Sequence, residues 1–204
     1  MQSSSNRLKK INFILVVSIV LCNAYILLVP LVPNISYWQH KKAVAAVAGL
    51  PYKTQDSNDS ANSLRYDIPK DNRLVIPSIA LNEAVYEGSD PNTVHKGVWA
   101  RPHTSTPNKG SNTVLVGHRF TYNGPATFYH LNKVIVGDRI LMYWQGTEYN
   151  YAVTTVKVVP ATALEIEDPT TIDTLTIYTC TPLWSAKDRL VVVAQKQGKT
   201  STNE

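Results

Sequence analysis

The chain has 204 residues, of which 44% are hydrophobic and 17% charged, and it contains 9 Gly, 12 Pro and 2 Cys. This composition excludes a fibrous repeat, a disulfide-stapled miniprotein and a chain that is disordered throughout. The net charge of +5 arises in the tails, because residues 66–195 carry 11 Lys and Arg against 12 Asp and Glu. Proteins that bind nucleic acid concentrate Lys and Arg on a folded surface, so we expect no nucleic-acid partner.

Near the N-terminus, residues 11–32 form an apolar run of 22 residues. As a helix this run would be about 33 Å long, sufficient to span a bilayer. Arg7, Lys9 and Lys10 precede it and favour a cytoplasmic N-terminus, residues 1–10, with everything after the span exported. We therefore expect a single-pass protein of the cell membrane whose folded domain is extracytoplasmic.

The alternative for this apolar run is a cleaved signal peptide, since Ala-Val-Ala occurs at residues 43–45 and 46–48 and resembles a cleavage site. A retained anchor is favoured because the apolar core of a signal peptide has about 7 to 15 residues. Both candidate cleavage sites also lie well beyond the end of the run.

After the span the sequence divides by composition into three parts. Residues 33–65 are small and polar and are interpreted as a stalk or linker, and residues 196–204 form a polar tail. Between them, residues 66–195 are sufficient for one domain with a hydrophobic core, but too few for two.

This domain has the pattern of a mainly β fold. Short segments rich in Val, Ile, Tyr and Thr, separated by turn residues, predict strands over 73–76, 80–87, 113–116, 139–144, 149–159, 175–180 and 190–194. Gln145–Glu148 reads as a hairpin turn, and only Pro125–Leu131 has the spacing of a helical turn. Seven or eight strands in one small domain predict a closed or nearly closed β-barrel.

Cys180 is the only thiol of this domain, since Cys22 lies in the apolar run. An unpaired thiol in an oxidising compartment is prone to wrong disulfides, so its presence favours a reactive role, although a buried and inert cysteine is the alternative. Cys180 ends a predicted strand, and Pro182 prevents further regular pairing. The thiol is therefore expected at a strand end beside an irregular loop.

A cation is expected beside the thiol. Arg189 begins the next apolar strand, so pairing of the two strands would place Cys180 and Arg189 at the same end. A guanidinium there can stabilise a thiolate, hold a peptide carbonyl or offset charge on a tetrahedral oxygen. The alternative is an Arg189 that pairs with Asp188 or is merely solvated.

A thiol nucleophile also needs a group that accepts and returns a proton. The domain offers His95, His103, His118 and His130. His118 follows the predicted strand 113–116 and a glycine, so it is also expected at a strand end, and it is the candidate acid and base. The other three are interpreted as ordinary surface or packing residues.

Other sites are not indicated by the sequence. There is no Cys-x-x-Cys pair, no Gly-rich phosphate loop and no His-Glu-x-x-His helix, and one thiol with scattered histidines makes a poor zinc site. We therefore expect neither a metal ion nor a cofactor. The acidic residues Glu165, Glu167 and Asp168 are interpreted as a solvated loop.

Several segments together resemble the sortases, which are membrane-anchored cysteine transpeptidases of bacterial surfaces. Residues 174–180, Thr-Leu-Thr-Ile-Tyr-Thr-Cys, are similar to the family's Thr-Leu-x-Thr-Cys strand. Residues 180–190 are similar to its Cys-to-Arg hairpin, and Val-Gly-His-Arg at 116–119 resembles its catalytic histidine segment. The resemblance extends over about residues 70–195.

The resemblance implies an eight-stranded sortase β-barrel in which Cys180, His118 and Arg189 converge. It implies that Cys180 attacks a Leu-Pro-x-Thr-Gly (LPxTG)-like sorting signal at the C-terminus of exported proteins, forming a thioacyl enzyme. An amine, such as a wall precursor or a pilin lysine, would then resolve this intermediate. Thr179 would support the substrate, and Trp184 could line the substrate groove, although packing is the alternative for Trp184.

The single N-terminal anchor favours class A, D or E, whereas Cys-Thr-Pro at residues 180–182 is common among pilin-polymerising sortases. Two other functions remain open: a sortase-like hydrolase, in which water resolves the thioacyl enzyme, and a noncatalytic membrane-tethered barrel that binds peptides.

Overall fold

The computed structural model describes residues 2–28 and 69–198. The stalk expected over 33–65 lies outside the described residues, as do residues 29–32 of the expected span and residues 199–204 of the tail. The chain divides into two compact units, residues 1–40 and 41–204.

The described part of the first unit is one helix, α1 (Gln2–Leu28), of 27 residues. It includes residues 11–28 of the apolar run. In the two described ranges, no helix combines the length and the apolar character that crossing a membrane requires. The transmembrane span over 11–32 is therefore not confirmed, and the boundaries of the five expected parts of the chain stay predictions.

The second unit contains a closed, mainly β barrel, as predicted. Its strands are β1 (Arg73–Ile76), β2 (Leu81–Tyr86), β3 (Val98–Ala100), β4 (Asn112–Val116), β7 (Arg139–Trp144), β8 (Thr147–Pro160), β9 (Thr174–Thr181) and β10 (Asp188–Lys196). They follow one another in the order β1-β2-β3-β4-β9-β10-β8-β7, and β7 pairs with β1 to close the barrel. The β2–β3 and β4–β9 pairs are parallel and the others antiparallel.

Short elements connect these strands. They are a two-stranded sheet of β5 (Phe120–Thr121) and β6 (Gly124–Pro125) and the 3-10 helices η2 (Pro77–Ile79), η3 (Pro91–Lys96), η4 (Leu131–Lys133) and η5 (Leu164–Glu167). The helical turn expected over Pro125–Leu131 is confirmed in part. Pro125 belongs to β6, but the N–H groups of Tyr129 and Leu131 donate to the carbonyls three residues earlier, and the 3-10 helix η4 follows at Leu131. Phe128 and Leu131 are both fully buried, so this turn packs both side chains on the core.

The hairpin turn expected after β7 is confirmed. Gln145 and Gly146 connect β7 to β8 with φ angles of 50° and 73°, and two consecutive positive values are typical of the tight turn between twisted strands.

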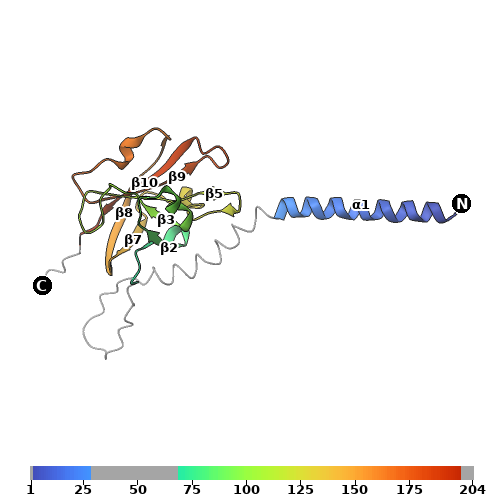
Figure 1. The fold of residues 1–204 in the computed structure, drawn as a ribbon, viewed down its shortest axis with the longest axis horizontal. Helices are drawn as coiled ribbons and strands as arrows, with labels where there is room; N and C mark the ends of the chain where they lie inside the picture. Colours follow the sequence, from blue (N-terminus) through green and yellow to red (C-terminus); the bar gives the residue numbers. More distant parts are fainter. Residues whose placement is uncertain (1, 29–68, 199–204) are drawn as a thin grey trace, which may run out of the picture. The chain divides into compact units, whose positions relative to one another are not determined.

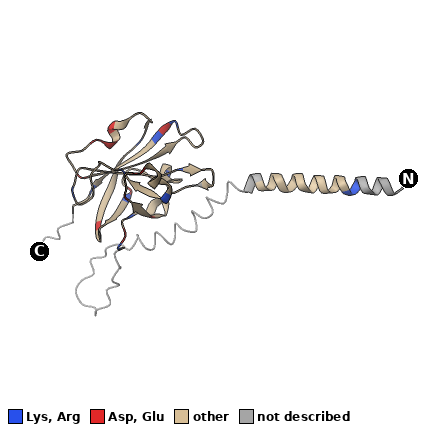
Figure 2. Ribbon diagram, in the orientation of Figure 1, with Lys and Arg blue, Asp and Glu red and all other residues tan. Residues whose placement is uncertain are grey.

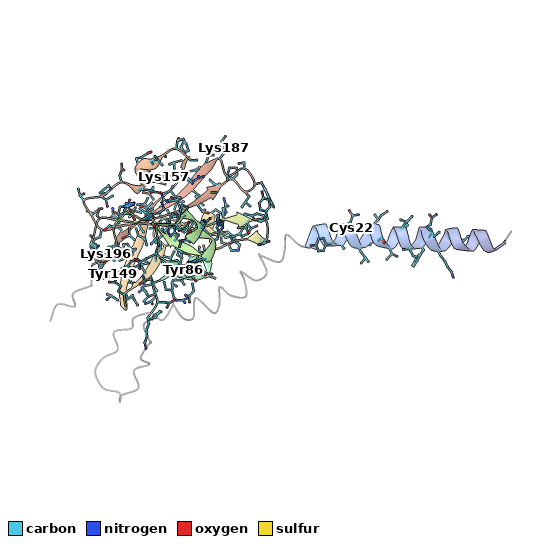
Figure 3. The ribbon with its side chains drawn as sticks, in the orientation of Figure 1. Cys22, Tyr86, Tyr149, Lys157, Lys187 and Lys196 are labelled. Carbon is cyan, nitrogen blue, oxygen red and sulfur yellow. The ribbon has the colours of Figure 1, made fainter. Side chains whose placement is uncertain are left out.

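Strand β10 ends at Lys196, whose Nζ lies 4.9 Å from the ring centre of Tyr149 on β8 (Figure 3). Acidic and basic residues are interspersed along the barrel (Figure 2).

Strands β9 and β10 are labelled in Figure 1. Strand β9 pairs with β4 and with β10, and it is buried on both faces over most of its length. Leu175 and Ile177 are fully buried on one face. On the opposite face Tyr178 packs with Val114 and Val191, and Ile166 of η5 packs against this cluster. Because alternate residues share a face of a strand, Cys180 lies on the same side of β9 as Tyr178. The connection between β8 and β9 thus covers part of the surface that continues toward Cys180.

Candidate active site

Cys180 and Arg189 lie directly opposite each other in the antiparallel β9–β10 pair. The thiol is partly exposed, and β9 ends one residue later at Thr181, before Pro182. The sequence predicted that the two residues lie near each other at the loop end, because the two strands follow one another in the chain and can pair.

His118 reaches the same end of the barrel through a parallel strand pair. Val116 at the end of β4 lies opposite Tyr178 of β9, and each chain continues two residues further, to His118 and to Cys180 respectively. The topology therefore places all three candidate catalytic residues at the same end of the barrel. Within residues 69–198 no hydrogen bond joins the thiol of Cys180 to His118.

The backbone before His118 is fixed by close packing. A Cβ atom on Gly117 would lie 2.8 Å from the ring of Phe128, so only glycine fits there. The N–H of Phe128 donates to the carbonyl of His118 at 2.9 Å. Phe128 thus holds the histidine segment by both its ring and its backbone.

Thr179 contributes to the same segment. Its side chain is 1% exposed, and its hydroxyl donates to the carbonyl of Gly117 at 2.8 Å. The resemblance implies that Thr179 supports the substrate, which stays a prediction. In the structure its hydroxyl bonds the backbone next to His118, so Thr179 links strand β9 to the histidine segment.

His95, interpreted from sequence as an ordinary residue, contacts His118 directly. Nδ1 of His95 lies 3.1 Å from Nε2 of His118, and the two rings stack with centroids 4.8 Å apart. Burial, and then the charge of His95, lower the pKa of His118. No local pattern indicates this contact, because η3 carries His95 to the site from 23 positions upstream.

Arg189 is held at the mouth of the hairpin by backbone groups. Its Nη1 donates to the carbonyls of Ala186 and Asp188, each at 3.0 Å. Among the described residues its guanidinium forms no ion pair, so the Asp188 carboxylate does not neutralise it. The positive charge stays available beside Cys180.

Arg119 is a second guanidinium near the nucleophile, and the sequence analysis assigned it no role. Its Nη1 donates to the hydroxyl of Thr181 at 2.8 Å, and its Nε to the carbonyl of Tyr129 at 3.4 Å. Partial burial lowers its pKa, but an arginine remains charged at any physiological pH. Arg119 therefore ties the residue after His118 to the residue after Cys180.

Trp184 lies in the β9–β10 loop and is 82% exposed. Its ring contacts Phe120 of β5 with centroids 4.2 Å apart, and its backbone has a φ of 77°. Trp184 thus contacts Phe120 with its ring while most of its surface stays exposed. The aromatic pair forms an apolar surface on the loop that follows the nucleophile.

The acidic loop between β8 and β9 is anchored to the barrel, contrary to the prediction of a solvated loop. Glu167 accepts hydrogen bonds from Nε and Nη2 of Arg101 at 2.9 and 3.1 Å, and from the hydroxyl of Tyr178 at 2.6 Å. Burial, and then Glu167, raise the pKa of Tyr178. Glu165, two residues earlier, is exposed as predicted. The prediction failed at Glu167 because its partners lie elsewhere in the fold, Arg101 just after β3 and Tyr178 on β9.

Comparison with known proteins gives one consistent family. A family model for the sortase domain matches residues 74–197. Sortase A of Bacillus anthracis is 29% identical over 126 residues, which cover 62% of this chain and 59% of that protein. The chain thus spans less than two thirds of the length of this curated relative.

Solved structures give the same result. The Clostridium perfringens sortase D5 transpeptidase is 25% identical with a TM-score of 0.57, over 63% of this chain and 79% of that one. Sortase C1 from Streptococcus suis is 28% identical with a TM-score of 0.59, over 67% of this chain and 78% of that one. These neighbours carry different class letters and leave the subclass open. Because the family model covers more than half of its length, the chain belongs to the sortase family.

Proposed function

We propose that this protein is a cysteine transpeptidase that cleaves an LPxTG-like sorting signal and transfers the acyl group to an amine. The observation that carries the proposal is the strand register. Cys180 lies opposite Arg189 in one hairpin, and His118 follows the strand that pairs with the nucleophile strand in parallel. A nucleophile, an acid and base, and a cation are the groups that acyl transfer requires.

In the first half-reaction the thiolate of Cys180 attacks the carbonyl carbon of the Thr-Gly bond. The guanidinium of Arg189 stabilises the negative charge on the tetrahedral oxygen. When the C–N bond breaks, protonated His118 gives its proton to the departing amine, and a thioester remains on Cys180. The amine leaves as a neutral group, so charge and protons balance.

In the second half-reaction an incoming amine attacks the thioester. His118, now neutral, accepts a proton from this amine as the new C–N bond forms. Collapse of the tetrahedral intermediate breaks the C–S bond and returns Cys180 as thiolate beside protonated His118. Division of the transfer into two steps allows an amine to compete with water for the thioester.

Substrate contacts belong to the same proposal. Exposed Trp184 and partly buried Phe120 form an apolar surface on the loop after the nucleophile, suited to the leucine and proline of a sorting signal. The expected substrates are exported proteins with such a signal, and the acceptor is an amine of a wall precursor or a pilin lysine.

Membrane attachment is also part of the proposal. Along α1 the large apolar side chains are exposed, with Phe13 at 70% and Leu21 at 65%, and a lipid environment would cover them. Arg7, Lys9 and Lys10 favour a cytoplasmic N-terminus, which would place the barrel at the outer surface of the cell membrane. Exported substrates and wall precursors meet at that surface.

The test is product analysis with the full chain in detergent micelles. The protein is incubated with an LPxTG peptide and an amine, and the products are identified by mass spectrometry. An amide adduct supports the proposal, whereas free acid alone would show a hydrolase. Cys180→Ala should abolish both products and Cys22→Ala neither, since Cys22 lies on α1.

Thiol alkylation separates the enzyme from a noncatalytic peptide-binding barrel. We expect Cys180 to be alkylated rapidly at mildly basic pH in the Cys22→Ala variant, where it is the remaining thiol. Slow alkylation together with unchanged peptide binding by Cys180→Ala would favour the binding protein.

A further inference from the structure

The contact between His95 and His118 joins the candidate acid and base to a residue that the proposed reaction does not use. The two ring nitrogens lie 3.1 Å apart, and the rings are stacked with an interplanar angle of 26°. His95 is exposed whereas His118 is half-buried. Two neutral imidazoles at this distance share one N–H, which one ring donates and the other accepts.

The segment that carries His95 is well fixed. Asp90 caps η3 by accepting from the backbone N–H of Asn92 at 2.9 Å, and Thr93 within η3 is 6% exposed. The indole N–H of Trp99 donates to the carbonyl of Gly88 at 2.9 Å and closes the loop that contains η3. His95 is therefore presented to His118 by an ordered connection between β2 and β3.

The contact with His95 engages only one of the two ring nitrogens of His118. Nε2 faces His95, and among the described residues Nδ1 of His118 has no hydrogen-bond partner. If His118 donates from Nε2, its Nδ1 is free to give or take a proton in each half-reaction. The hydrogen bond to His95 then persists in both states, because Nε2 keeps its proton while Nδ1 is loaded and unloaded.

We propose that His95 is a positioning residue for His118, which accepts the Nε2–H of His118 and thereby holds the imidazole with Nδ1 as the reacting nitrogen. The role resembles that of a carboxylate that orients a catalytic histidine, with a neutral ring as the acceptor. This inference rests on the proposed function, since it assigns a reacting nitrogen to the proposed acid and base.

The charged and titratable groups at this end of the barrel come from three elements and from the connection after β4. They are His95 on η3, Arg119 next to His118 in the chain, Cys180 on β9 and Arg189 on β10. If both imidazoles become protonated, both facing nitrogens carry a proton and the hydrogen bond is lost. The positioning should therefore fail at acid pH.

The test compares His95→Ala, His95→Asn and a control, His103→Asn, in the full chain. Asparagine at position 95 keeps an amide near the place of Nδ1 and can accept the same hydrogen bond. His103 is exposed, and asparagine tolerates its φ of 65°. The measurements are ¹⁵N NMR of the His118 ring, the rate of Cys180 alkylation, and kcat and KM for transpeptidation, each against pH.

We expect His95→Ala to lower kcat about tenfold with KM nearly unchanged. The Nε2–H tautomer of His118 should no longer predominate. His95→Asn should recover most of kcat and of the tautomer preference. His103→Asn should behave as the wild type in all three measurements.

An unchanged tautomer and titration of His118 in His95→Ala would overturn the inference, whatever the activity. Failure of the proposed function is distinguishable. If the wild-type protein forms no amide product but the His118 tautomer still changes in His95→Ala, the positioning role stands and the transpeptidase proposal fails. Normal transpeptidation with an unaltered kcat in His95→Ala removes the positioning role alone.

Discussion

The hydroxyl of Thr179 donates a 2.8 Å hydrogen bond to the carbonyl of Gly117. It joins the residue before the candidate nucleophile to the residue before the candidate acid and base, across 62 positions of sequence. Both partners are buried, so water cannot replace the bond if it is lost. The relative position of Cys180 and His118 is thus controlled from inside the barrel.

Thr179→Val keeps the shape of the side chain and removes the hydroxyl. The free energy of unfolding should fall by about 1–2 kcal/mol, because the Gly117 carbonyl is left unpaired. The value of kcat should also fall, since the segment before His118 loses its anchor. Urea unfolding and peptide kinetics measure the two effects.

Thr176→Val is the matched control. Its hydroxyl is buried and donates to Asn112 at 2.8 Å, away from His118. We expect a similar loss of stability with little change of kcat. Equal losses of kcat in both variants would show that Thr179 acts only through general stability.

Glu167→Gln should loosen the connection between β8 and β9. The substitution removes the charge that accepts from Arg101 and weakens the bond from Tyr178, at a cost of about 1–2 kcal/mol in stability. KM for the sorting peptide should rise, because η5 covers the surface that continues toward Cys180. Glu165→Gln, at an exposed position of the same 3-10 helix, should change neither stability nor KM.

Arg119→Gln should lower kcat/KM about tenfold, because the link between the His118 segment and Thr181 is lost. Arg119→Lys should recover only part of the lost kcat/KM, since one ammonium group cannot contact both Thr181 and Tyr129 as the guanidinium does. Arg139→Gln is the control, as Arg139 contacts Asn150 and Glu148 on the β7–β8 hairpin. If Arg119→Lys matched the wild type, the two-point contact would be irrelevant.

Stability should decrease as the pH falls through the ordinary range of histidine. Burial, and then His95, lower the pKa of His118, so the unfolded chain binds this proton more readily than the folded chain. The free energy of unfolding must then fall from its neutral-pH value as the pH drops below about 6.5. His118→Gln should flatten this slope in thermal melts between pH 7.5 and 5, and a slope that stays as steep would contradict the assignment.

Strand periodicity predicted most of the barrel. The β1 and β7 ranges are as predicted, and five other strands differ by only one to a few residues at their ends. The barrel strand that was missed, β3, has three residues, which is too few to show an alternation. It forms because its neighbours β2 and β4 offer free edges, which is a property of the assembled sheet.

The sequence by itself determined the mainly β fold and the pairing of Cys180 with Arg189, because alternation and a short hairpin are local properties. Only the tertiary structure decided what surrounds them. The parallel β4–β9 pair brings His118 to Cys180, and barrel closure brings His95 to His118 and Arg101 to Glu167 over 66 positions. Such contacts depend on which strands become neighbours, and no local pattern of residues encodes that choice.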